Sequence, residues 1–153
     1  MKKNFPLLLC CVMLFLFSAC NKRSGKPKIL VFTKTAGFYH QSIPAGVAAI
    51  QKLGAANDFD VDTTSDASMF TDDILREYSA IVFLNTTGPL FNTVQRIALE
   101  RYIQAGGGYM GIHAATDAEY DWGWYTRLAG ANFESHPHQQ EAKLIINDKN
   151  HAS

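Results

Sequence analysis

Two runs of apolar residues constrain the fold of this chain more than any other feature. Lys28–Thr33 (KILVFT) and Ala80–Leu84 (AIVFL) are short, continuous and rich in β-branched or aromatic side chains. Such runs are typical of strands that are buried on both faces, as in a parallel sheet that carries helices on each side. The sequence therefore favours a parallel α/β fold.

Strand and helix patterns alternate along the rest of the chain, as a doubly wound sheet requires. Ser42 is expected to cap the first helix and Gly54 to end it. Thr71 is expected to cap the second helix, and Asn92 with Gln95 resembles a capping box. The strands are predicted at residues 28–33, 59–63, 80–84, 109–112 and 142–146, and the helices at residues 43–53, 72–78, 92–106 and 121–128.

Three loops should meet at one edge of this sheet. Right-handed crossovers bring the strand-to-helix loops at 34–41, 85–91 and 113–120 to the carboxyl ends of the strands, where such sheets bind ligands. The chain stops directly after the last predicted strand, without the helix that usually closes such a sheet. We therefore expect a fragment that is incomplete at its C-terminus.

The stretch GGGYMGIHAATD (106–117) carries the first candidate site. Three glycines, a short strand and then His113 follow the pattern of a turn that exposes a reactive side chain before a helix. His113 could act as a general base, ligand or hydrogen-bond donor, with Asp117 beside it. The alternative is a buried structural histidine. The glycines precede a strand and lack a Gly-Lys-Ser/Thr ending, so a phosphate-binding loop is not indicated.

The loop at 37–42 (GFYHQS) carries the second candidate. His40 stands just before a helix, where it could bind a ligand hydroxyl or shuttle a proton. The alternative is a histidine that only satisfies loop carbonyls. Contacts to a small substrate are assigned to residues of this loop, of the loop after the third strand and of two later segments: Gly37, Phe38, Ser42, Thr86, Thr87, Trp124 and Glu134.

The segment FESHPH (133–138) carries the third candidate. Glu134, His136 and His138 alternate, and two imidazoles with a carboxylate could ligate zinc. His-x-His in a polar loop is more often exposed or structural, so no cofactor is expected and zinc stays an alternative. Trp122, Trp124 and Tyr125 could stack on sugar rings, although such aromatic residues usually belong to a core.

The N-terminus predicts export. Two lysines precede an apolar run at 5–17, and Ser18 and Ala19 lead to Cys20, as in a bacterial lipoprotein signal. We predict a signal peptide at 1–19, lipidation of Cys20 and a polar tether at 20–27, which makes the chain a membrane-anchored lipoprotein facing the periplasm or cell surface. An ordinary cleaved signal or a short hydrophobic anchor is the alternative.

Charge and cysteine content exclude two classes of function. Processing before Cys20 removes Lys2 and Lys3, which leaves 12 basic against 14 acidic residues, so a nucleic-acid partner is not expected. The other two cysteines, Cys10 and Cys11, lie in the signal. The remaining domain therefore has no disulfide and no thiol nucleophile.

Four motifs together resemble the ThuA-like (trehalose utilisation) family: KILVFTKTAGFYHQSIPAG, FLNTTG, YIQAGGGYMGIHAATD and GANFESHP. The resemblance covers a single domain at 28–153. It implies the flavodoxin-like, three-layer α/β/α fold of class I glutamine amidotransferases. It also implies that His40, His113 and His136 are the characteristic histidines of the family. True amidotransferases have a cysteine where this chain has His113, so glutamine hydrolysis through a thioester is not expected.

Three functions follow as hypotheses. The first is an enzyme of disaccharide or 3-keto-sugar metabolism with His113, His40 and His136 as catalytic groups and Asp117 or Glu134 orienting a histidine. The second is a non-catalytic sugar-binding module of a larger lipoprotein. The third is a zinc-dependent hydrolase. The expected partner is a small carbohydrate, with the membrane reached only through the lipid anchor.

Overall fold

The computed structural model describes residues 25–150, so the signal peptide, Cys20 and most of the tether lie outside the described residues. Its centre is a four-stranded sheet whose strands are all parallel and follow the order β2-β1-β3-β4. The strands are β1 (Lys28–Phe32), β2 (Asp60–Thr64), β3 (Ala80–Leu84) and β4 (Gly108–Ile112). This is the flavodoxin-like order, so the predicted fold class is confirmed.

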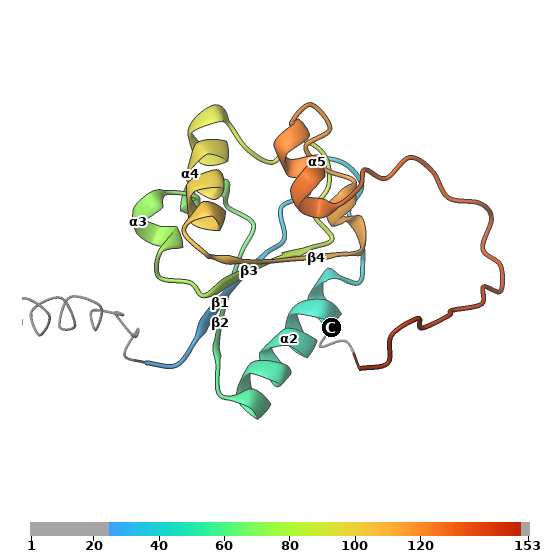
Figure 1. Cartoon of the computed structure of the whole chain (residues 1–153), viewed down its shortest axis with the longest axis horizontal. Coiled ribbons are helices and arrows are strands. Elements are labelled where there is room, and N and C mark those ends of the chain that lie inside the picture. The colour runs from blue at the N-terminus through green and yellow to red at the C-terminus, as the bar shows by residue number, and fades with distance from the viewer. Residues whose placement is uncertain (1–24, 151–153) are drawn as a thin grey trace, which may run out of the picture.

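Helices cover both faces of the sheet and make three layers (Figure 1). One helix packs on the first face and three on the second: α2 (Ile43–Asn57) against α3 (Asp72–Leu75), α4 (Thr93–Gln104) and α5 (Gly123–Ala129). Two short 3₁₀ turns, η1 (Ala67–Met69) and η2 (His113–Thr116), complete the elements. Within the described residues, no helix has the length and apolarity that a bilayer crossing needs.

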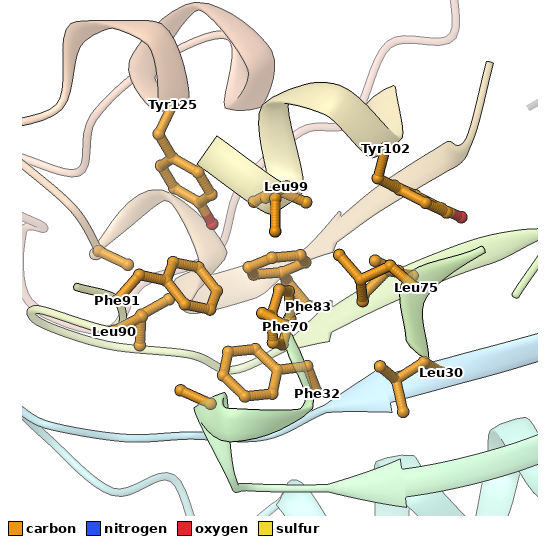
Figure 2. Packing of buried hydrophobic residues seen from close by; sticks show 14 of the residues in the cluster. Leu30, Phe32, Phe70, Leu75, Phe83, Leu90, Phe91, Leu99, Tyr102 and Tyr125 are labelled. Atoms are coloured by element: carbon orange, nitrogen blue, oxygen red, sulfur yellow. The ribbon is translucent and has the colours of Figure 1, made fainter. Parts of the chain in front are cut away.

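The larger core lies between the sheet and the three helices (Figure 2). Four phenylalanines fill its centre, and the rings of Phe32 and Phe91 stack at 5.4 Å between centroids. Phe70 lies 4.6 Å from Phe32, and Phe83 packs on both. Burial of aromatic side chains supplies about 25 cal/mol per Å² of apolar surface. On the other face of the sheet, Val31, Val82 and Leu84 form a second buried cluster against α2. Because both faces are covered, β1 and β3 lack any polar alternation.

The glycine run has a packing function in the structure. Gly106 ends α4 with φ +92°, a left-handed conformation that glycine adopts without strain. A Cβ on Gly107 would lie 2.3 Å from the Tyr102 ring, and one on Gly108 would lie 2.9 Å from the Ala80 Cβ. The run therefore lets the chain leave α4 and enter β4 close to its neighbours.

Several predicted ends of elements hold and others are wrong. The Asn92–Gln95 capping box is present, and the Thr71 hydroxyl accepts from the Ile74 amide at 3.2 Å. Gly54 does not end α2, because its bare backbone packs on Phe59 and the helix continues to Asn57. Helix α3 is shorter than predicted, since the chain after Leu75 turns to enter β3.

Two further predictions are also wrong. Ser42 stands at the start of α2 but does not cap it, because its hydroxyl accepts from Asn85 Nδ2 at 3.0 Å. No strand forms at 142–146, where Leu144, Ile145 and Ile146 are all more than half exposed. A strand needs a partner for its backbone groups as well as suitable side chains, and this segment lies apart from the sheet.

Candidate active site

The loops that follow β1, β3 and β4 are joined at the carboxyl edge of the sheet. A parallel bridge pairs Thr35 with Thr87, and a second pairs Gly88 with Ala118. The Ala36 amide donates to the Thr87 carbonyl at 2.7 Å, and the Gly88 amide donates to the Asp117 carbonyl at 2.8 Å. The predicted convergence of these loops is confirmed.

His113 lies at a sharp turn. It directly follows β4, opens η2 and has φ +53°, a left-handed conformation that is uncommon for a residue with a Cβ. Its side chain is exposed, so the alternative of a buried structural histidine is wrong. Asn85, at the end of β3, has the same φ of +53°. Backbone strain of this kind tends to occur at functional sites.

A cavity of about 290 Å³ brings together residues from separate parts of the chain. The rings of His40 and His113 meet edge to face, 4.7 Å between centroids and 87° between planes. The residues that line the cavity are Phe38, His40, His113, Ala114, Thr116, Asp117, Phe133 and His136. Three histidines and one carboxylate that are distant in sequence thus share one small site.

His40 has an unused polar atom at this site. Its Nδ1 is buried and has no hydrogen-bond partner among the described residues. The ring of Phe38 packs edge-on against the His40 ring, with 4.9 Å between the two ring centroids. Since a buried polar atom without a partner costs about 1–3 kcal/mol, a ligand that pairs with it would gain that energy. The alternative, in which the His40 ring satisfies loop carbonyls, does not match this geometry.

Comparison with known proteins assigns the chain to a family. Residues 28–153 match the model of the ThuA family, which is described as trehalose utilisation. The chain belongs to the ThuA family. It is similar to a crystal structure of a ThuA-like protein from Bacteroides uniformis, with 27% sequence identity and a TM-score of 0.59. That match covers 72% of this chain and 46% of the other chain. A search of curated proteins found no match to this chain.

The site of this ThuA-family chain includes a residue that the sequence did not suggest. The Tyr120 hydroxyl lies 2.6 Å from Asp117 Oδ1 and 2.8 Å from the Phe133 carbonyl oxygen. Partial burial and the hydrogen bond to Asp117 raise the pKa of Tyr120 to about 12. The hydroxyl therefore keeps its hydrogen at neutral pH. Only its position three residues after Asp117 could have drawn attention to it.

Glu119 braces the loops of the ThuA-family site from behind. Its carboxylate is 1% exposed and accepts from the backbone amides of Leu90 and Phe91. It also forms an ion pair with Arg96 at 2.7 Å. Arg96 pairs in addition with Asp121 at 2.8 Å, and that hydrogen bond lowers the pKa of Asp121. Glu119 thus holds the loop after β3 against the loop after β4.

Several residues assigned to substrate contact lie outside the cavity lining. Thr86 and Thr87 are fully buried. The Thr87 hydroxyl accepts from the Gly37 amide at 3.2 Å and lies 3.1 Å from the Phe38 carbonyl, so it holds the loop that carries His40. Trp124 stacks on Trp122 at 5.1 Å between centroids and packs against the core. Also outside the lining are Gly37, Ser42, Glu134 and His138.

In residues 25–150, no group of three or more His, Cys, Asp or Glu side chains is arranged to hold a metal ion.

A larger cavity of about 620 Å³ lies between α3 and α4, near the start of β4, away from the site described above. Its arginines, Arg76 and Arg101, are paired with Asp73 and Asp72. Among residues 25–150, those that line this second cavity include no histidine and no buried polar side-chain atom without a partner.

Proposed function

We propose that this ThuA-family chain acts on a carbohydrate of the disaccharide or 3-keto-sugar class in the cavity at the carboxyl edge of the sheet. The observation that supports the proposal is the meeting of His40, His113, His136 and Asp117 around one cavity. Its volume is at the low end for small-ligand sites, which suits one sugar unit. Phe38 and Phe133 add aromatic surface, on which the C–H face of a sugar ring can pack.

The chemistry of these side chains suits proton transfer at a sugar carbon or hydroxyl. Imidazole changes its charge near neutral pH and can both take and give a proton. His113, exposed at the turn, is the proposed acid or base. His40 offers its unpaired Nδ1 to a substrate hydroxyl. Asp117 accepts a hydrogen bond from the substrate or orients an imidazole.

The same arrangement argues against glutamine amidotransfer. That chemistry uses a thiolate at the turn after the strand, and this chain has His113 there. All three cysteines (positions 10, 11 and 20) precede β1. No thiol of the chain follows that point, so the described domain has none to offer to a thioester. We infer that the scaffold is used for a different reaction.

Histidine NMR with trehalose tests the proposal directly. The chain has five histidines, and His40, His113 and His136 line the cavity whereas His138 does not. We expect added trehalose to shift the ring resonances of those three in a saturable way. His138, two residues from His136, serves as the internal control. No shift with either trehalose or its 3-keto derivative, or equal shifts at His138, would contradict a carbohydrate site.

We also propose that the chain is an exported lipoprotein anchored through Cys20, as the sequence of the N-terminal segment indicates. Bacterial cells expressing the full chain should incorporate labelled palmitate into it and retain it in the membrane fraction. Cys20→Ala should abolish the labelling, whereas Cys10→Ala and Cys11→Ala should not. Labelling that survives Cys20→Ala would rule out this anchor.

A further inference from the structure

We infer that Tyr120 is a positioning residue that couples ligand binding at Asp117 to closure of the segment at 131–138, here called the strap. The strap carries His136 to the cavity, and Figure 1 shows the chain after α5 leaving the domain as an open loop. The inference rests on the proposed function, because the ligand in it is the carbohydrate. Its structural part can be tested without that ligand.

One hydroxyl hydrogen of Tyr120 faces two acceptors. Asp117 Oδ1 lies 2.6 Å away and the Phe133 carbonyl oxygen 2.8 Å away. A tyrosine hydroxyl carries one hydrogen, so only one of these oxygens receives it at a time. An ionised carboxylate is the stronger acceptor, because a charge-assisted hydrogen bond is roughly twice as strong as a neutral one. In the empty site, Asp117 therefore takes the hydrogen for most of the time.

The strap has few other attachments. Among residues 25–150, the strap is tied to the rest of the domain at Asn132 and Phe133. The Thr126 hydroxyl lies 3.1 Å from Asn132 Oδ1, and the Phe133 amide donates to the Thr116 carbonyl at 2.9 Å. The remaining strap residues are exposed and form neither helix nor strand. The hydrogen bond between the Tyr120 hydroxyl and the Phe133 carbonyl is thus a substantial part of what holds the strap. Of these contacts in residues 25–150, it is the one whose side chain also contacts an acidic residue of the cavity, Asp117.

Ligand binding changes the competition between the two acceptors. A sugar hydroxyl that donates to Asp117 satisfies part of that carboxylate, which then competes less well for the Tyr120 hydrogen. The hydrogen turns to the Phe133 carbonyl and fastens the strap. The ring of Phe133 lies 5.9 Å from that of His136, so fastening Phe133 also restrains the histidine. Tyr120 thereby links an occupied Asp117 to a closed cavity.

Hydrogen exchange at the Phe133 amide measures the state of the strap. One net hydrogen bond is worth about 0.5–1.5 kcal/mol, so we expect trehalose to slow exchange in the wild-type chain by roughly 2- to 13-fold. Tyr120→Phe should remove this slowing, because the ring stays and the hydroxyl is lost. Tyr39→Phe is the matched control: Tyr39 is similarly exposed, lies in the neighbouring loop and donates no hydrogen bond among the described residues.

A second variant separates this inference from the proposed function. Asp117→Asn replaces the charged acceptor by a neutral one, so exchange at Phe133 should slow without any sugar. Adding Tyr120→Phe to Asp117→Asn should reverse that slowing. If the Phe133 amide of Asp117→Asn exchanges at the wild-type rate without sugar, the proposed coupling between Asp117 and the strap is overturned. Slowing by trehalose that persists in Tyr120→Phe would overturn it too. If trehalose has no effect on any form while the Asp117→Asn response is present, the carbohydrate fails and the coupling stands.

Discussion

Replacing His113 by asparagine is expected to lower kcat/KM for trehalose or its 3-keto derivative by about 10²–10⁴-fold, the usual contribution of a general acid or base. Asparagine tolerates the left-handed backbone that His113 adopts at φ +53°, so the turn should survive. His113→Ala would remove the same imidazole but would add backbone strain. Turnover, followed by NMR of the sugar, is the measurement.

His138→Asn is the control for this prediction. It removes an exposed histidine of the same chain that does not line the cavity. Its kcat/KM should stay within about twofold of wild type, since surface substitutions are usually close to neutral. Equal turnover in His113→Asn and wild type would remove the assigned role of His113. Trehalose binding that survives His113→Asn, without turnover in any form, would instead identify a sugar-binding module.

Glu119→Ala is expected to lower the free energy of unfolding by about 3–5 kcal/mol, the cost of breaking a buried charge pair by removing one partner. The change would leave Arg96 without its buried carboxylate and two backbone amides, of Leu90 and Phe91, without their acceptor. Glu119→Gln keeps one oxygen as acceptor for the two amides but loses the charge and turns an amide NH2 toward Arg96, so its cost should be smaller than that of Glu119→Ala. Urea unfolding at neutral pH measures both.

Asp121→Ala is the control for Glu119. It removes the other carboxylate that pairs with Arg96, but this one has a side chain that is 76% exposed. Exposed ion pairs contribute little to stability, so Asp121→Ala should unfold at nearly the same urea concentration as the wild type. A Glu119→Ala variant no less stable than Asp121→Ala would show that Glu119 is not the brace of the two loops.

The sequence predicted those parts of the fold that depend on local pattern. β1 and β3 are continuous apolar runs, and a strand buried on both faces requires just that. The capping box at Asn92 and Gln95 is local too, because both of its hydrogen bonds lie within one turn. The meeting of His40 and His113 followed from topology, since both lie in the connections that follow parallel strands at the carboxyl edge of the sheet.

Features that depend on distant partners were not predictable. The sequence suggests that the Ser42 hydroxyl caps α2, but in the structure this hydroxyl accepts a hydrogen bond from the Asn85 side chain. Thr87 was predicted to contact the substrate, yet its hydroxyl is hydrogen-bonded to the Gly37 amide and the Phe38 carbonyl. The segment at 142–146 has suitable side chains for a strand, but its pairing depends on where the chain lies after α5. Sequence patterns indicate what a residue can do, whereas its neighbours in space decide what it does.

The strap has a consequence for how this site could diversify. The loops bearing His40, His113 and Asp117 are braced by buried groups, so most substitutions there would be costly to stability. The strap contributes only exposed residues and little to the core. Insertions and replacements are tolerated best in such segments. A library varied only at strap positions other than Phe133 and His136, on an otherwise unchanged domain, should therefore yield altered substrate preference at little loss of folded protein.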